Sequence, residues 1–300
     1  MASPSPARPE APVTDLWDDL LGCIDLRRLP PAAERGTGDA APEQPQIANH
    51  GAVHVHFEGR NQQLSYRRVF GGQLLAQFVQ AASLTCPGKT IKSLHALFPR
   101  EGQPDEPVRY QVERHHEGRA YATLTILARQ TPGVIATASV SMHAGEDGPS
   151  HQAISPVPAV PGTDYRVELG LLPWETRSAA NLDSPQPAPP EFSLWMRTPP
   201  VSPALASALA AYATDLTLIG TALRPIEGIS QRDAGTAFTS AVTSHTLWFH
   251  RPFRTDGWLL LRQHSPLLAH GRCFGQGDVL TEDGSLVASY TQEALLRFKR

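Results

Sequence analysis

Apolar residues recur at helical spacing between positions 71 and 85, in a run that Gly71-Gly72-Gln73 opens and Pro87-Gly88 closes. This pattern predicts a helix over 71–85. The segments that follow alternate apolar and polar residues, are rich in Thr, Val, Ile and Tyr, and are separated by short turns, which predicts an antiparallel meander. These predicted strands are 90–99, 107–115, 119–129 and 134–143.

A second block of the chain repeats this order of elements. A helix is predicted at about 203–213, followed by a further helical stretch that begins near Asp215 and is stopped by Pro225. Gly118-Arg119 and Gly271-Arg272 each precede the last pair of predicted strands in their block. The pattern favours a tandem duplication of one helix-plus-sheet unit. The predicted strands of the second block are 236–250, 257–264, 270–280 and 285–297.

Stretches rich in proline and alanine without periodicity separate the blocks and predict connections. Residues 1–15 are predicted to be disordered and residues 30–46 to be flexible, and between them apolar residues from Trp17 to Leu29 recur at helical spacing. The resulting division of the chain is a flexible N-terminal region with a short helix at 1–46, an N-terminal unit at 47–145, a proline-rich linker at 146–194 and a C-terminal unit at 195–300.

Composition narrows the class of protein. Hydrophobic residues make up 41% of the 300 residues and charged residues 18%, which is typical of a globular protein. The net charge of −3 supplies no general attraction to nucleic acid or to a membrane surface, and we expect neither as a partner. No apolar run approaches the roughly 20 residues of a spanning helix, and the N-terminus has no apolar signal-peptide core, so we expect a cytoplasmic protein.

Familiar catalytic motifs are missing from the sequence. It contains no G-x-S-x-G, no P-loop and no G-x-G-x-x-G after a strand, which disfavours the usual serine hydrolases and nucleotide enzymes. His54 and His56 share one face of a predicted strand, but no Cys or further His stands at ligand spacing. We therefore predict no metal site and no cofactor.

Three other positions are candidates for chemistry, each with a structural alternative. Asp215 stands where the chain enters a helical stretch, so its carboxylate can be an N-cap. Gln292, near the end of the last predicted strand, can bond a water or substrate, or simply be solvated. Gly71-Gly72 can form a tight turn, or can let a substrate carbonyl approach the backbone amides at the helix start.

Several short segments together resemble the acyl-CoA thioesterase II family, whose members are double hotdog proteins. The resemblance spans about 57–144 and 191–298. It implies an α+β fold of two tandem hotdog units, each a long helix wrapped by an antiparallel sheet. The segments are VFGGQ at 69–73, SLHALF at 93–98, WMR at 195–197, YATDL at 212–216, HTLWFHRPF at 245–253 and QE at 292–293.

The resemblance also implies an activity, the hydrolysis of a fatty acyl-CoA thioester by a water that an Asp, a Ser or Thr, and a Gln hold. By matching positions, the Asp is Asp215 and the Gln is Gln292. The family pattern Ser/Thr, any residue, Asp, His reads Val242-Thr243-Ser244-His245 here, so the hydroxyl is displaced.

Two residues can replace that hydroxyl. Because alternate strand residues share a face, Ser244 is the preferred substitute, and Thr243 would need a bulge. Gly72, Gln73 and His95 are the candidate substrate-binding residues.

The expected partner is an acyl-CoA or acyl-carrier thioester, and pairing of exposed sheet edges predicts a homodimer or larger homo-oligomer. Two other functions stay open. One is a tailoring enzyme of secondary metabolism that acts on a CoA-bound or carrier-bound acyl intermediate, which the altered Val242-Ser244 stretch favours. The other is a non-catalytic acyl-CoA-binding module, which the retained Asp215 and Gln292 disfavour.

Overall fold

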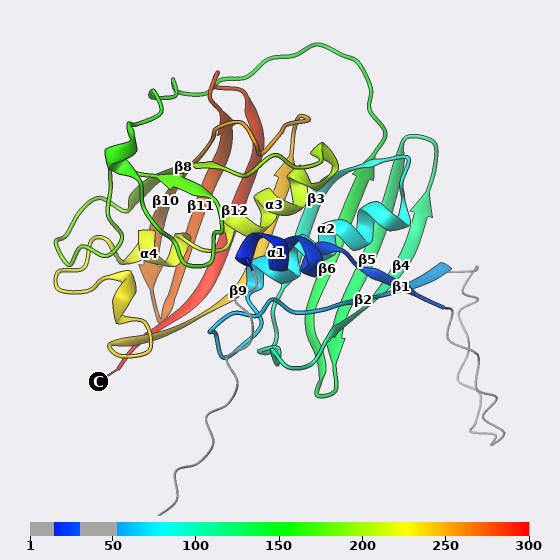
Figure 1. Cartoon of the computed structure of the whole chain (residues 1–300), viewed down its shortest axis with the longest axis horizontal. Coiled ribbons are helices and arrows are strands. Elements are labelled where there is room, and N and C mark those ends of the chain that lie inside the picture. The colour runs from blue at the N-terminus through cyan, green and yellow to red at the C-terminus, as the bar shows by residue number, and fades with distance from the viewer. Residues whose placement is uncertain (1–14, 31–52, 300) are drawn as a thin grey trace, which may run out of the picture.

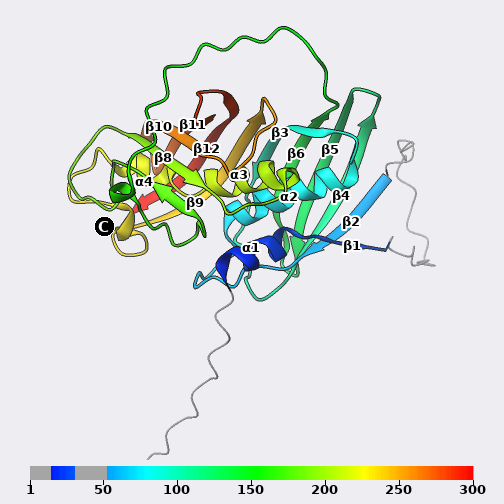
Figure 2. The ribbon, with the colours of Figure 1, turned by 45° about the horizontal axis from the view of Figure 1, so that its top comes forward.

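The computed structural model describes residues 15–30 and 53–299, which form one antiparallel sheet of 12 strands with helices against one face (Figures 1 and 2). The strand order is β1-β2-β4-β5-β6-β3-β9-β12-β11-β10-β8-β7. The predicted disordered segment 1–15 and flexible segment 30–46 lie almost wholly outside the described residues.

The first half of the sheet wraps a single long helix, α2, and the predicted helix at 71–85 is confirmed. The second half wraps α3 and α4. The elements of the first half are α1 (Leu16–Ile24), β1 (Arg27–Leu29), β2 (Val53–Gly59), α2 (Gly71–Thr85), β3 (Thr90–Leu97), β4 (Val108–Glu117), β5 (Tyr121–Gln130) and β6 (Gly133–His143).

The connection and the second half contain the remaining elements. They are η1 (Thr163–Tyr165), β7 (Glu175–Arg177), β8 (Glu191–Arg197), η2 (Pro203–Leu205), α3 (Ala206–Thr214), α4 (Leu218–Leu223), η3 (Gln231–Asp233), β9 (Phe238–Phe249), β10 (Leu259–Ala269), β11 (Arg272–Thr281) and β12 (Leu286–Phe298).

The two halves join through one antiparallel pair of strands, β3 and β9, in which Ser93 lies opposite Trp248 and Leu97 lies opposite Ser244. Each half therefore repeats the same unit, a helix covered by a curved sheet, although in the second half the helical segment is divided into α3 and α4. The predicted duplicated α+β double hotdog fold is confirmed. Because β3 ends at Leu97, residues 238–243 of β9 extend beyond it without a partner strand on that side.

The helices supply the core. Leu75 and Phe78 of α2 and Leu209 and Tyr212 of α3 are fully buried between the helices and the sheet. The segment Pro203–Leu223 is apolar and long enough to be compared with a membrane span, but most of it is buried inside the protein. Its apolar side chains thus pack as core.

Two details differ from the sequence-based expectations. The segment predicted as a linker contains β7 and the first half of β8, so part of it belongs to the sheet. In the described part of the chain the two edge strands, β1 and β7, are only three residues long. Short edges offer few backbone groups for pairing with another copy, so edge pairing is a weak reason for an oligomer, and the oligomeric state stays a prediction.

Candidate functional site

Asp215 lies at the point where α3 ends, as its C-cap, and α4 begins only at Leu218 with Thr217 as its N-cap. The sequence suggested that this carboxylate can cap the helical stretch that follows it, but it does not cap α4. It faces the first turn of α2, the helix of the other unit. There the backbone N–H of Gly72 interacts with the carboxylate.

The glycines at the start of α2 allow this approach. A Cβ on Gly71 would lie 2.7 Å from Oδ2 of Asp215, and a Cβ on Gly72 would lie 2.4 Å from the carbonyl oxygen of Tyr212 in α3. The N-cap residue of α2, Phe70, has no side-chain capping bond. Asp215 supplies negative charge at this helix N-terminus, where it interacts favourably with the unpaired amides and the helix dipole.

Burial dominates the electrostatics of Asp215. The residue is 5% exposed, and desolvation raises the pKa of its carboxyl from 3.8 to about 7. The Gly72 N–H and the Arg68 guanidinium lower the pKa and partly offset this effect. The carboxyl is thus poised to take up and release a proton near neutral pH, as a general base must.

His245 and Gln292 lie next to Asp215 on the helix-facing side of the sheet. They are direct cross-strand neighbours on β9 and β12, and both are buried. The Nδ1 atom of His245 is 3.0 Å from Oε1 of Gln292 and 3.8 Å from Oδ1 of Asp215. On the other side of the ring, Nε2 is 3.0 Å from the Thr214 hydroxyl.

His245 is neutral at pH 7, because desolvation lowers the pKa of its imidazole to about 4, although the Gln292 hydrogen bond raises it in part. The approach of His245 to Asp215 is therefore not an ion pair. The ring stacks on Tyr290 with 6.0 Å between ring centroids and 7° between planes, which fixes its orientation.

Two buried polar atoms of this cluster have no hydrogen-bond partner among the described residues. They are Oδ1 of Asp215, an acceptor, and Nε2 of Gln292, a donor. Buried polar groups are nearly always paired in folded proteins, and an unpaired one calls for an explanation, such as a bound water or a catalytic role. A water that donates to Oδ1 and accepts from Nε2 satisfies both atoms.

A bulge on β9 decides where the displaced hydroxyls point. Val242 lies opposite Ala294 and Ser244 lies opposite Glu293, so Thr243 is the extra residue. Val242 packs with Ala294 on the helix side, whereas Ser244 pairs with the exposed Leu97 on the outer face. The expectation that Ser244 and Val242 share a face is therefore wrong, because the bulge reverses the alternation.

Thr243 sits at the bulge and lines the cavity described next. Its hydroxyl donates to the carbonyl oxygen of Glu293 at 3.1 Å. Within the described residues, neither this hydroxyl nor that of Ser244 bonds to Asp215 or Gln292. The position that carries a Ser or Thr in the family pattern is apolar here.

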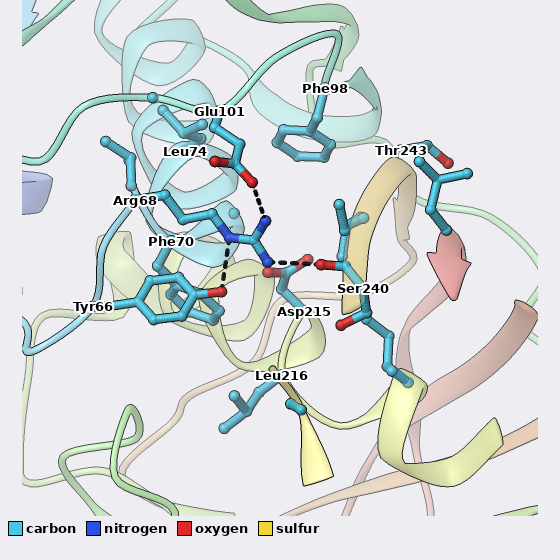
Figure 3. A pocket seen from close by; sticks show the side chains of 18 of the residues that line it. Tyr66, Arg68, Phe70, Leu74, Phe98, Glu101, Asp215, Leu216, Ser240 and Thr243 are labelled. Carbon is cyan, nitrogen blue, oxygen red and sulfur yellow. Dashed lines mark hydrogen bonds and ion pairs between the residues drawn. The ribbon is translucent and has the colours of Figure 1, made fainter. Parts of the chain in front are cut away.

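A cavity of about 500 Å³ opens beside Asp215, where β9 extends beyond the end of β3. Its walls come from both units, namely the start of α2, the turn between α3 and α4, the first half of β9 and the loop after β3. Figure 3 shows Asp215 and Leu216 on one side of it and Phe98 and Thr243 on another. Much of the lining is apolar, as an acyl group requires.

Arg68 is one of the residues that line this cavity, and its guanidinium points toward Glu101, Tyr66 and Ser240 (Figure 3). Its guanidinium donates to the Tyr66 hydroxyl at 2.9 Å, to Glu101 at 2.6 Å and to the carbonyl oxygen of Ser240 at 2.8 Å. These bonds connect the N-terminal unit to β9 of the C-terminal unit. They also place a positive charge near Asp215.

The three predicted substrate-binding residues lie in different places. Gly72 is at the site, where its N–H interacts with Asp215 and its Cα packs closely against the Tyr212 carbonyl of α3. However, Gly71 rather than Gly72 lines the cavity. Gln73 points into a buried polar cluster, where it accepts from the Gln62 N–H and donates to Asn61. His95 is exposed on the outer face, against Trp248.

Sequence reasoning did not select Thr214, His245 or Arg68 as site residues. Thr214 directly precedes Asp215, and His245 directly precedes the segment TLWFHRPF, so both stand beside residues that were selected. No local pattern marks Arg68 as a site residue, because two of its three partners, Glu101 and Ser240, are distant in sequence. Within the described ranges, no group of three or more His, Cys, Asp or Glu residues could hold a metal ion.

Comparisons with known proteins agree with the fold. The chain matches the family model of the acyl-CoA thioesterase N-terminal domain over residues 61–143. It matches that of the acyl-CoA thioesterase C-terminal domain over residues 141–296. Acyl-CoA thioesterase 2 of Haemophilus influenzae is 33% identical over 268 residues, which cover 81% of this chain and 92% of that protein.

Solved structures give the same picture. The acyl-CoA thioesterase II TesB2 from Mycobacterium marinum superimposes with a TM-score of 0.66 at 31% identity, covering 81% of this chain and 92% of that one. A tesB protein from Mycobacterium avium subspecies paratuberculosis superimposes with a TM-score of 0.71 at 26% identity, covering 93% of this chain and 98% of that one.

Proposed function

The chain belongs to the acyl-CoA thioesterase II family, and from this premise we propose that it hydrolyses an acyl-CoA thioester to a free acid and CoA. In this proposal Asp215 and Gln292 hold the attacking water. The observation that carries the proposal is the pair of buried atoms without a hydrogen-bond partner among the described residues, Oδ1 of Asp215 and Nε2 of Gln292. Asp215 also lines a cavity whose largely apolar walls suit an acyl chain.

The chemistry proceeds by general base catalysis. The Asp215 carboxylate takes a proton from the water while the water oxygen attacks the thioester carbonyl carbon. The tetrahedral intermediate then collapses with cleavage of the C–S bond, and the CoA sulfur leaves with the proton that Asp215 returns. Gly71 lines the cavity at the first turn of α2, where backbone N–H groups lack helical partners and can stabilise the oxyanion.

The direct test is release of free CoA thiol from short, medium and long acyl-CoAs by the purified protein. We expect turnover with at least one class of chain. If the folded protein releases no thiol from any acyl-CoA but turns over a carrier-bound thioester, the proposal for CoA esters is wrong and the tailoring function replaces it. Saturable binding of acyl-CoA without turnover would instead indicate the binding module.

The rate should depend on pH through Asp215. Only the ionised carboxylate accepts a proton, and its pKa is about 7, so kcat/KM should rise tenfold per pH unit below pH 7 and level off above it. His245, with a pKa near 4, adds no further step between pH 5 and 9. A kcat/KM that is constant from pH 5 to 9 would contradict the role of Asp215.

A substitution that restores the hydroxyl at Val242 should increase the rate of hydrolysis. This residue lines the same cavity as Asp215, at the position where the family pattern has a hydroxyl. We expect Val242→Thr to raise kcat by about tenfold, because a third hydrogen bond to the water or intermediate lowers the barrier. Val242→Ala is the matched control, since it changes the volume without adding a hydroxyl, and it should bring no gain. An equal increase in both variants would refute the explanation.

A further inference from the structure

We propose that His245 is a positioning residue for the hydrolysis, a neutral imidazole with its proton on Nδ1 that holds the Gln292 amide in the orientation the water site needs. The inference rests on the proposed function, in which Gln292 binds the attacking water. Within it, His245 does not itself exchange a proton with water or substrate.

The surroundings of the ring fix the tautomer. Nδ1 faces two acceptor atoms, Oε1 of Gln292 at 3.0 Å and Oδ1 of Asp215 at 3.8 Å. A ring nitrogen that faces acceptors is stable only when it carries the proton, since an unprotonated nitrogen would repel both oxygens.

The opposite side of the ring is consistent with this assignment. With the proton on Nδ1, Nε2 is an acceptor, and the Thr214 hydroxyl lies 3.0 Å from it and can donate. The same hydroxyl can otherwise donate to the carbonyl oxygen of Ala211, also at 3.0 Å. The imidazole thus gives Thr214 a second acceptor within the core.

The consequence reaches the water site through Gln292. Because Nδ1–H holds Oε1, the NH₂ group of Gln292 is directed away from His245 as a free donor, and this atom is buried without a partner among the described residues. The opposite tautomer would favour the reversed amide. Gln292 would then present a carbonyl oxygen in place of its NH₂ group, and the water would lose the donor from which it accepts a hydrogen bond.

The ring is held firmly enough for this role. His245 is fully buried and stacks on Tyr290, whose hydroxyl is anchored at 2.7 Å to Gln263. Neither the ring nor the amide can rotate without breaking a buried hydrogen bond, which is costly in a low-dielectric interior.

Nitrogen-15 NMR of the wild-type protein tests the tautomer without any assay of activity. Protein labelled in its histidine side chains gives separate signals for protonated and unprotonated ring nitrogens. Loss of one set of signals in His245→Asn assigns His245 among the 12 histidines. We expect a protonated Nδ1 and an unprotonated Nε2 that do not change between pH 5.5 and 8. A protonated Nε2 would overturn the proposal.

Two amide substitutions at the same position test the link to catalysis. Asparagine places its NH₂ group near the position of Nδ1 and can still donate to Gln292, whereas glutamine places its amide near Nε2. If His245 acts through Gln292, His245→Gln lowers kcat about 10²-fold with little change in KM, and His245→Asn retains at least tenfold more activity. Equal losses in two folded variants would indicate a purely structural role and overturn the proposal.

Thr214 supplies a second pair of variants. Thr214→Ser keeps the hydroxyl that donates to Nε2 and should keep most of kcat, whereas Thr214→Val removes it and should lower kcat. The tests separate the two proposals. If the wild type releases no CoA thiol, the proposed function fails whatever the tautomer is. If it does release thiol and Nε2 carries the proton, only the role of His245 fails.

Discussion

Asp215→Asn should lower kcat for acyl-CoA hydrolysis about 10³-fold, because an amide cannot accept the proton of the attacking water and general base catalysis contributes factors of this size. The asparagine is nearly the same size as the aspartate, so the cavity and the position of α2 should be kept. Thiol release under saturating acyl-CoA measures the effect. A variant with more than a tenth of the wild-type kcat would rule out Asp215 as the base.

The stability of this variant provides the control for folding. Because the pKa of Asp215 is raised to about 7, the folded state holds this proton more tightly than the unfolded state. The wild type therefore loses stability as pH rises from about 4 to 7, on the order of 3–4 kcal/mol. Asp215→Asn removes that loss, so its free energy of unfolding at pH 8 should exceed that of the wild type. Denaturant titration at pH 5 and pH 8 measures both values.

Gly72→Ala should damage stability and activity together. Its Cβ would lie 2.4 Å from the Tyr212 carbonyl oxygen and 2.5 Å from the ring of Phe70. The Tyr212 carbonyl belongs to the backbone of α3 and cannot move aside as a flexible side chain can, so α2 and α3 must move apart. We expect a loss of about 2 kcal/mol in the free energy of unfolding. We also expect kcat to fall about 10²-fold, since Asp215 is held by the first turn of α2 and a displacement near 1 Å has such an effect.

Gly88→Ala is the matched control for this change. Gly88 lies in the turn after α2, and a Cβ there would meet no atom within 4 Å. Its stability should equal or slightly exceed that of the wild type, because alanine reduces the entropy of the unfolded chain. Equal stability of Gly72→Ala and Gly88→Ala would show that the helices do not need this close approach.

The fold could be predicted because its signals are local and repeated. The helix at 71–85 has an apolar run with clear stop signals, and the strands that follow alternate over lengths that leave little choice of register. The segment before 195 was harder. Its prolines suggested a linker, yet residues 175–177 pair with the end of β8 as the outermost strand. Proline-rich sequence does not exclude such short edge strands, because an edge strand needs only some of its N–H groups.

The site was only half predictable, because its contacts join distant parts of the chain. Asp215 and Gln292 were candidates from their places in the predicted elements, and the resemblance supplied their roles. However, the helix whose N-terminus Asp215 faces is α2, in the other unit, which begins 144 residues earlier in the chain. No local pattern distinguishes such a distant helix from the next helix as the one that an aspartate caps. The face of Ser244 depended on a bulge at Thr243, where β9 runs past the end of β3. His245 was visible only as one residue of a motif.

The account's central claim is that a water held by Asp215 attacks the thioester directly, and one turnover in ¹⁸O-labelled water tests it. With enzyme in excess over acyl-CoA, direct attack places one ¹⁸O atom in the released acid and none in the protein. Mass spectrometry of the acid and of the peptide that contains Asp215 detects the ¹⁸O content of each. An unlabelled acid together with ¹⁸O in the Asp215 carboxylate would mean that Asp215 itself attacks the thioester, and would contradict the account.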